Sequence, residues 1–190
     1  MRRTYLKKLL KTAVIIATLV VALTAVSCKK EKNSVERFYG DISYDAPMLV
    51  MSMEEVEDEE EPGIVYREIE DMDAVLNNST VPVMIYFYSS TATDVAGVTA
   101  GVEDIAQKLD GRVIVLSVDI MRLRDVASRF KVQYVPDFVL VQGNNVKSSF
   151  NAIDYDYWTT TDVYNWLINE GVLHRRNGMS RRMCRRTFQT

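Results

Sequence analysis

From residue 63 onward, the chain alternates between short apolar runs and longer amphipathic stretches. Residues 83–88 (VMIYFY) form a continuous apolar run, which is typical of a strand buried on both faces of a sheet. After this run, apolar side chains recur at helical spacing from Val95 to Leu109. The pattern predicts strands at residues 64–69, 83–88, 113–120, 138–141 and 146–150. It predicts helices at residues 72–77, 95–109, 123–130 and 160–171.

This order of elements predicts an α/β fold. The two strand–helix–strand units imply a parallel central pair of strands with right-handed connections. The last two strands flank the turn residues Gly143, Asn144 and Asn145, which favours a hairpin antiparallel to that pair. We therefore expect a central mixed sheet flanked by helices, in a domain spanning residues 63–173.

A different apolar pattern lies near the N-terminus. Basic residues precede the apolar run 13–25, which is shorter than the roughly 20 residues that a membrane-spanning helix needs. The run leads into Ala25-Val26-Ser27-Cys28, which resembles the lipobox of bacterial lipoproteins, although the family prefers Leu at the position of Ala25. The resemblance implies a signal peptide at residues 1–27 and lipidation of Cys28. An uncleaved signal anchor is the alternative, and both interpretations place the domain outside the cytoplasm.

Residues 28–62 are interpreted as a lipid anchor and an acidic tether. Between Glu54 and Glu61 most side chains are carboxylates, and such a block repels itself and extends. The apolar segment 46–53 is unusual for a spacer and predicts either an extra strand at a sheet edge or a docking segment for a partner. By the sorting logic of some Gram-negative bacteria, Lys29 after the lipidated cysteine favours the outer membrane.

Charge is unevenly distributed along the chain. There are 23 Lys and Arg residues against 26 Asp and Glu, but the only charges before Cys28 are five positive ones. The remaining chain is therefore more acidic than the total of -3 suggests, which argues against nucleic acid as a partner.

Residues 64–172 are similar to thioredoxin in element order and in local sequence. Phe87-Tyr88-Ser89 resembles the family's Phe-Trp-Ala at the end of the central strand, and Val132-Gln133-Tyr134-Val135-Pro136 resembles the segment that carries its cis-proline. The spacing between the two segments needs no gap. The resemblance implies a thioredoxin-like three-layer sandwich, with Pro136 as the cis-proline.

The catalytic positions differ from the family's pattern. The Trp-Cys-Gly-Pro-Cys motif aligns with residues 91–95, so Ala92 and Val95 stand where the two cysteines would be. The family's buried aspartate aligns with Tyr86 and its paired lysine aligns with Ser117. Since thiol exchange needs a thiolate, the resemblance implies a domain without catalytic residues.

The sequence offers few residues for other kinds of catalytic or metal-binding site. His174 is the only histidine and lies beyond the last predicted helix, so we expect no nucleophilic triad, no metal site and no cofactor. Thr91 and Asp94 have the spacing of a capping box at a helix start. Asp94 and Asp137 are either two carboxylates meeting in the former catalytic cleft or separate solvated acids.

The C-terminal segment, residues 174–190, is basic. It is expected to be a flexible tail, a segment that meets anionic lipid or lipopolysaccharide headgroups, or a segment that folds back on the acidic run. Its Cys184 is the candidate for an intermolecular disulfide that would link two chains.

These observations favour a non-catalytic protein of the cell envelope that binds an envelope protein or an extended peptide. The candidate groove residues are Thr91, Val135, Pro136 and Asp137. The alternatives are a redox helper acting through Cys184 or with a partner oxidoreductase, and a purely structural lipoprotein.

Overall fold

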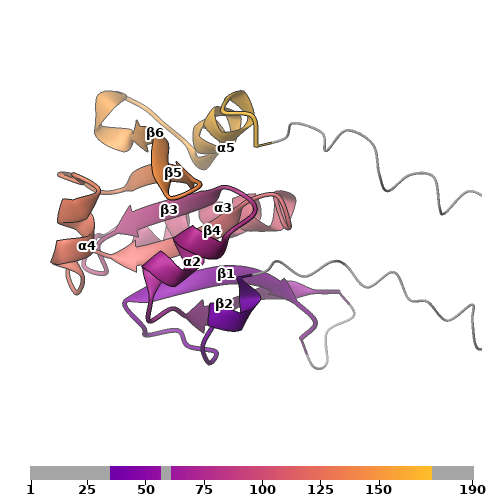
Figure 1. Cartoon of the computed structure of the whole chain (residues 1–190). Helices are drawn as coiled ribbons and strands as arrows, with labels where there is room; N and C mark the ends of the chain where they lie inside the picture. Colours follow the sequence, from indigo (N-terminus) through magenta and orange to yellow (C-terminus); the bar gives the residue numbers. More distant parts are fainter. Residues whose placement is uncertain (1–34, 57–60, 173–190) are drawn as a thin grey trace, which may run out of the picture. The chain divides into compact units, whose positions relative to one another are not determined.

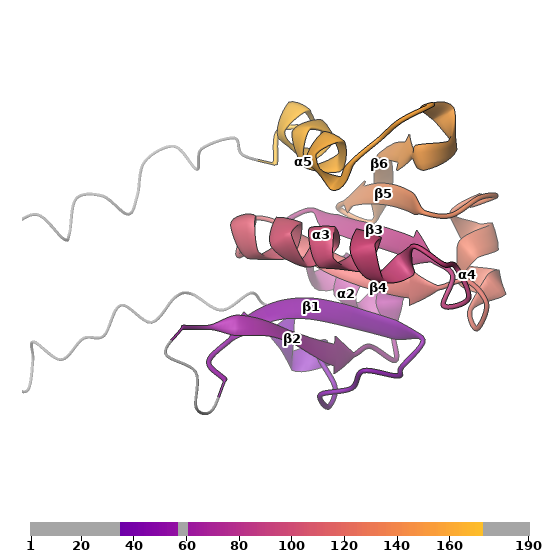
Figure 2. The same cartoon turned by 180° about the vertical axis from the view of Figure 1, so that it is seen from behind.

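The computed structural model describes residues 35–56 and 61–172. They form one six-stranded sheet of order β2-β1-β4-β3-β5-β6 (Figures 1 and 2). The strands are β1 (Met48–Glu54), β2 (Gly63–Glu68), β3 (Val83–Tyr88), β4 (Ile114–Asp119), β5 (Asp137–Gln142) and β6 (Asn145–Asn151). The helices are α2 (Met72–Asn78), α3 (Val95–Lys108), α4 (Arg124–Arg129) and α5 (Thr160–Asn169), with short 3-10 turns η1 (Glu36–Phe38) and η2 (Ala152–Asp154).

The predicted central pair is confirmed, because β3 and β4 are parallel neighbours joined through α3. The hairpin of β5 and β6 is also confirmed, and β5 pairs antiparallel with β3. Strand and helix bounds agree with the predicted ranges to within about two residues at each end.

Two hydrophobic clusters lie on opposite faces of the sheet. On one face α2 and α4 pack against side chains such as Ile85, Phe87 and Leu116. On the other face α3 and α5 pack against side chains such as Tyr86 and Phe138. Successive residues of β3 alternate between the two clusters, as the pleat of a strand requires. The three layers are visible in Figures 1 and 2, where α2 and α4 lie on one side of the sheet and α3 on the other.

The predicted boundary at residue 63 is wrong. Residues 35–56 belong to the folded domain and are not a tether, because Val35 is fully buried and β1 lies within the sheet. Strand β1 pairs antiparallel with β4 on one side and with β2 on the other.

The predicted strand at 46–53 is confirmed, but its expected position at a sheet edge is wrong. Met48, Leu49, Val50 and Met51 are all at least nine-tenths buried. Four consecutive buried apolar residues are covered on both faces, which is the environment of an interior strand. The sheet edge next to β1 is formed by β2.

Candidate functional site

The loop before α3 holds the residues aligned with the family's catalytic motif. It follows β3, and a hydroxyl network organises it: the Ser89 Oγ lies 2.9 Å from the Thr91 Oγ1 and accepts a bond from the Thr91 amide at 3.3 Å. The Ala92 amide donates to the Ser89 carbonyl at 3.0 Å. Hydrogen bonds to Ser89 therefore fix the conformation of this loop.

The predicted capping box of Thr91 and Asp94 is wrong. Helix α3 begins at Val95 with Asp94 as its N-cap residue, and the Asp94 side chain makes no capping hydrogen bond. The Thr91 hydroxyl contacts Ser89 instead. A capping box occurs at α5, where the Asp162 carboxylate accepts from the amide and hydroxyl of Thr159, each at 2.8 Å.

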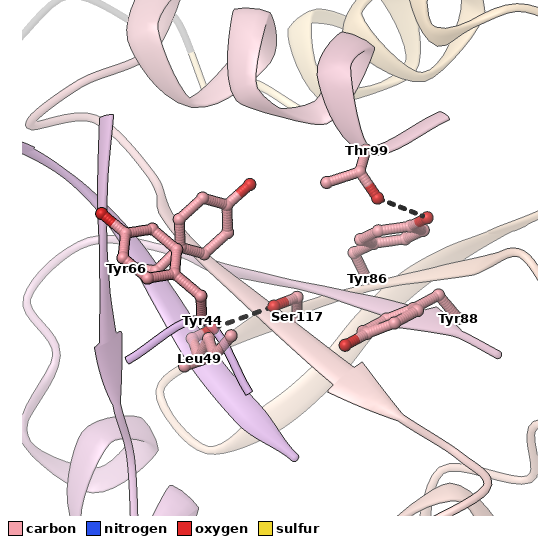
Figure 3. Close-up of a pocket in the computed structure, with 7 residues that line it drawn as sticks. All are labelled: Tyr44, Leu49, Tyr66, Tyr86, Tyr88, Thr99 and Ser117. Atoms are coloured by element: carbon pink, nitrogen blue, oxygen red, sulfur yellow. Dashed lines mark hydrogen bonds between the residues drawn. The ribbon is translucent and has the colours of Figure 1, made fainter. Parts of the chain in front are cut away.

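Two side chains occupy the positions aligned with the family's buried acid and lysine. Tyr86 is 1% exposed, and its hydroxyl lies 3.4 Å from that of Thr99. Burial raises the pKa of Tyr86 to about 12, so its phenol stays neutral at physiological pH. Ser117 donates to the Leu49 carbonyl at 3.4 Å. Both residues line a pocket between the sheet and α3 (Figure 3).

The segment before β5 forms the second feature of the site. The Val135–Pro136 peptide bond is cis, as the resemblance implies. Beside it lies an open groove with a volume of about 500 Å³. Its lining residues are Ile120, Gln133, Tyr134, Val135, Ala152, Ile153 and Trp158. We call it the proline groove.

The four candidate groove residues have different positions. Val135 lines the proline groove and Pro136 follows it through the cis bond. Asp137 is buried within the sheet, where it pairs with Phe87 and Asn151. Thr91 is exposed in the loop before α3 and is not a lining residue of the groove.

The Asp137 carboxylate lies close to Asn151 and Asp154. With the Asn151 amide oriented to satisfy its hydrogen bonds, its nitrogen donates to both carboxylate oxygens at 2.9 Å. Burial raises the pKa of Asp137 to about 6, and the charge of Asp154 adds to this effect, while the Phe138 amide opposes it. The charge of Asp94 instead contributes, after burial, to the raised pKa of Tyr86. Asp94 and Asp137 therefore have different neighbours.

Sequence reasoning missed the contribution of residues 150–158 to the groove. This segment supplies Ile153 and Trp158, and its Tyr155 ring stacks on Phe150 with centroids 4.7 Å apart. The run of aromatic residues between a strand and a helix was the available signal.

Residues 35–56 and 61–172 contain neither a metal-binding group of side chains nor a membrane-spanning helix. No group of three or more His, Cys, Asp or Glu side chains there could hold a metal ion. No helix in the same ranges is long and apolar enough to cross a membrane. The lipidation candidate Cys28, the disulfide candidate Cys184 and the basic tail lie outside the described residues.

Comparison of the sequence with known proteins identifies the family of this chain. A family model described as Thioredoxin matches residues 63–156. Thioredoxin 1 of Chlorobaculum tepidum is 32% identical over 85 residues, which cover 44% of this chain and 84% of the relative. Thioredoxin-1 of Drosophila yakuba is 24% identical over 72 residues, covering 38% and 67%. The crystal structure of Deadhead, a germline-specific thioredoxin of Drosophila melanogaster, matches with a TM-score of 0.42 at 20% identity, covering 47% and 80%. The chain belongs to the thioredoxin family.

Proposed function

We propose that this chain is a non-catalytic thioredoxin-family module of the bacterial cell envelope, which binds an extended peptide segment of a partner protein in the proline groove. The observation that carries the proposal is the open groove beside the cis Val135–Pro136 bond, in a chain with Ala92 and Val95 at the catalytic positions.

The backbone beside the groove supports peptide binding. The N–H and C=O groups of Gln133, Tyr134 and Val135 have no hydrogen-bond partner among the described residues. Backbone groups of this kind are satisfied by water or by another chain. An extended peptide pairs with such groups through its own backbone, which needs no thiol on either side.

The rim of the groove supports an apolar peptide. Tyr134 is 59% exposed and Ile153 is 58% exposed, although both side chains are large and apolar. Exposed aromatic side chains around a concave surface are typical of binding sites, since their burial contributes much of the binding energy.

The catalytic positions support binding without thiol exchange. Exchange requires a thiolate that attacks a disulfide and a second thiol that resolves the intermediate. Neither Ala92 nor Val95 supplies sulfur, and Tyr86 and Ser117 provide no acid–lysine pair for proton transfer. A redox role for Cys184 would lack a resolving thiol in the described domain.

The envelope location rests on the N-terminal sequence. We propose that Cys28 carries the lipid anchor and that the domain faces the periplasm from the outer membrane of a Gram-negative bacterium. Mass spectrometry of the mature protein tests this, because the N-terminal peptide should begin at a modified Cys28. A mature N-terminus at another, unmodified residue would contradict the anchor.

Site-specific photo-crosslinking tests the groove. A photoreactive phenylalanine analogue is placed at position 134 or 153, and at position 146 as a control, in cells that carry the protein naturally. Val146 on β6 is 57% exposed, which matches Ile153 at 58%. We expect the same discrete adduct from positions 134 and 153 and none from 146. Equal labelling at all three positions, or none, would contradict a specific groove partner.

A further inference from the structure

A second cavity lies between the sheet and α3 and shares no lining residue with the proline groove. It has a volume of about 260 Å³ and is lined by Tyr44, Leu49, Tyr66, Tyr86, Tyr88, Thr99 and Ser117. We call it the tyrosine pocket. Figure 3 shows Tyr44 and Tyr66 gathered on one side and Tyr86 and Tyr88 on the other, with Ser117 between them.

The pocket arises from one small residue in a row of large ones. Across the sheet, Phe138, Tyr86, Ser117 and Leu49 are register partners on β5, β3, β4 and β1. The Ser117 side chain is the smallest of the four, so it leaves space beside Tyr86. Strand β1 closes the far side, although it precedes the matched segment 63–156.

The walls of the tyrosine pocket are fixed by ring contacts. The Tyr86 ring stacks on Tyr88 and on Phe138, with centroids 5.4 Å and 5.3 Å apart. On the opposite side, Tyr44 and Tyr66 lie 5.9 Å apart at 60°. Tyr66, Tyr86 and Tyr88 are therefore in place before a ligand binds, while Tyr44, at 76% exposed, lies at the rim of the pocket.

Acidic side chains dominate the charges around these rings. Glu103 accepts a hydrogen bond from the Tyr66 hydroxyl. In addition to burial, the negative charge of Asp94 raises the pKa of Tyr86, and the charges of Asp119 and Asp45 raise the pKa of Tyr88. Arg122 is the opposing cation at Tyr88, and its guanidinium is already paired with Asp45 at 3.3 Å.

We propose that the tyrosine pocket binds the quaternary ammonium group of a small organic cation. Electron-rich phenol rings attract such a group through the ring quadrupole, and surrounding carboxylates add to the attraction. A methylated ammonium is also more easily dehydrated than a protonated amine, which suits an apolar lining. The volume lies below the range of about 300 to 1,000 Å³ typical of drug-sized ligands, so the occupant is small.

The carboxylates also select between sources of this group. A free choline-like cation meets mainly carboxylates around the pocket, with Arg122 as the exception, whereas phosphocholine, as in a lipid headgroup, brings a phosphate toward Glu103, Asp94 and Asp119. The free cation is therefore the proposed occupant. Its binding does not depend on the proline groove or on the proposed function.

An NMR titration of the full chain in a non-ionic detergent, at constant ionic strength, tests the proposal. The probes are choline, its neutral carbon isostere 3,3-dimethylbutan-1-ol, and phosphocholine. We expect saturable shifts of the Leu49, Thr99 and Ser117 amides with choline, and binding at least about tenfold weaker with the isostere. Equal binding of the isostere, tighter binding of phosphocholine, or no saturable shift at these amides would overturn the proposal.

Variants at the rim of the tyrosine pocket test the contribution of the Tyr44 ring to binding without disturbing the fold. Tyr44 is 76% exposed, so Tyr44→Ala should leave the structure intact and weaken choline binding at least about threefold, while Tyr44→Phe keeps the ring and the affinity. Glu103→Gln should weaken choline but not the isostere. Tyr157→Ala, at a residue 95% exposed outside the pocket, is the control. Unchanged affinity in both Tyr44→Ala and Glu103→Gln would contradict the proposed site.

Discussion

The Glu54 carboxylate binds the Arg67 guanidinium through two hydrogen bonds, from Nε at 2.6 Å and from a terminal nitrogen at 2.7 Å. This pair joins the end of β1 to β2, and both side chains are a little over a quarter exposed. The first residue of the acidic run is therefore part of the domain. The Glu54 carboxylate is the largest cause that raises the pKa of Arg67.

Removing this pair should weaken the β1–β2 hairpin modestly. A double-mutant cycle of Glu54→Gln and Arg67→Met should give a coupling free energy of about 0.5 to 1 kcal/mol, because the pair is bidentate but partly solvated. Urea unfolding at low and high salt measures it, and the coupling should shrink at high salt. The exposed pair of Asp104 and Lys108 on α3 is the control and should couple less. Equal coupling in the two pairs would contradict this account of the hairpin.

Truncating an interior side chain of β1 should unfold the domain more easily. Val50 is 1% exposed, so Val50→Ala should lower the free energy of unfolding by about 2 kcal/mol through lost burial and a residual cavity. Val146→Ala on β6, at a residue 57% exposed, should change it by less than about 0.5 kcal/mol. Thermal or urea unfolding measures both. A Val50→Ala protein as stable as the wild type would restore the tether interpretation of this segment.

The element order of the domain was predictable because its periods are strong. The run 83–88 and the helical spacing from Val95 to Leu109 each specify one type of element, and the structure has both. The position of β1 was harder to predict, since strand order depends on contacts between segments distant in the sequence. Four consecutive apolar residues at 48–51 were the local signal of an interior strand.

The candidate site was predictable only in part. The cis bond before Pro136 followed from the resemblance, and Val135 lines the groove beside it. The contribution of Ile153 and Trp158 depends on how the loop after β6 returns to the sheet, which no local pattern specifies. The capping prediction at Thr91 failed because Ser89 competes for the same hydroxyl.

Replacing Asp137 should make the protein less sensitive to pH. Its pKa is raised from 3.8 to about 6, so the folded state binds a proton that the unfolded state has already released between these values. Stability from this group is therefore lost as pH rises from about 4 to about 6. We expect Asp137→Asn to be more stable than the wild type by about 1 to 3 kcal/mol at pH 7, and the two to converge near pH 4. Urea unfolding across this pH range measures the difference. A variant less stable than the wild type at pH 7 would mean that Asn151 holds an ionised carboxylate.

Truncating exposed side chains at the rim of the proline groove should weaken binding of the partner without affecting the fold. Tyr134→Ala and Ile153→Ala together should reduce the amount of partner recovered with the protein by about tenfold or more, because exposed aromatic anchors carry much of such binding energy. Val146→Ala should leave recovery unchanged. Comparable recovery by all three proteins, at matched stability, would show that the partner binds elsewhere.

An insulin-reduction assay distinguishes peptide binding from thiol exchange in this protein. The rate of insulin reduction by dithiothreitol is measured without protein, with the wild-type chain, with Cys184→Ser, and with an active thioredoxin as the positive control. We predict that the wild type and Cys184→Ser leave the rate at that of dithiothreitol alone, because Ala92 and Val95 provide no attacking or resolving thiol. Turnover by the wild type above that rate would contradict the non-catalytic account, and its loss in Cys184→Ser would assign the activity to that thiol.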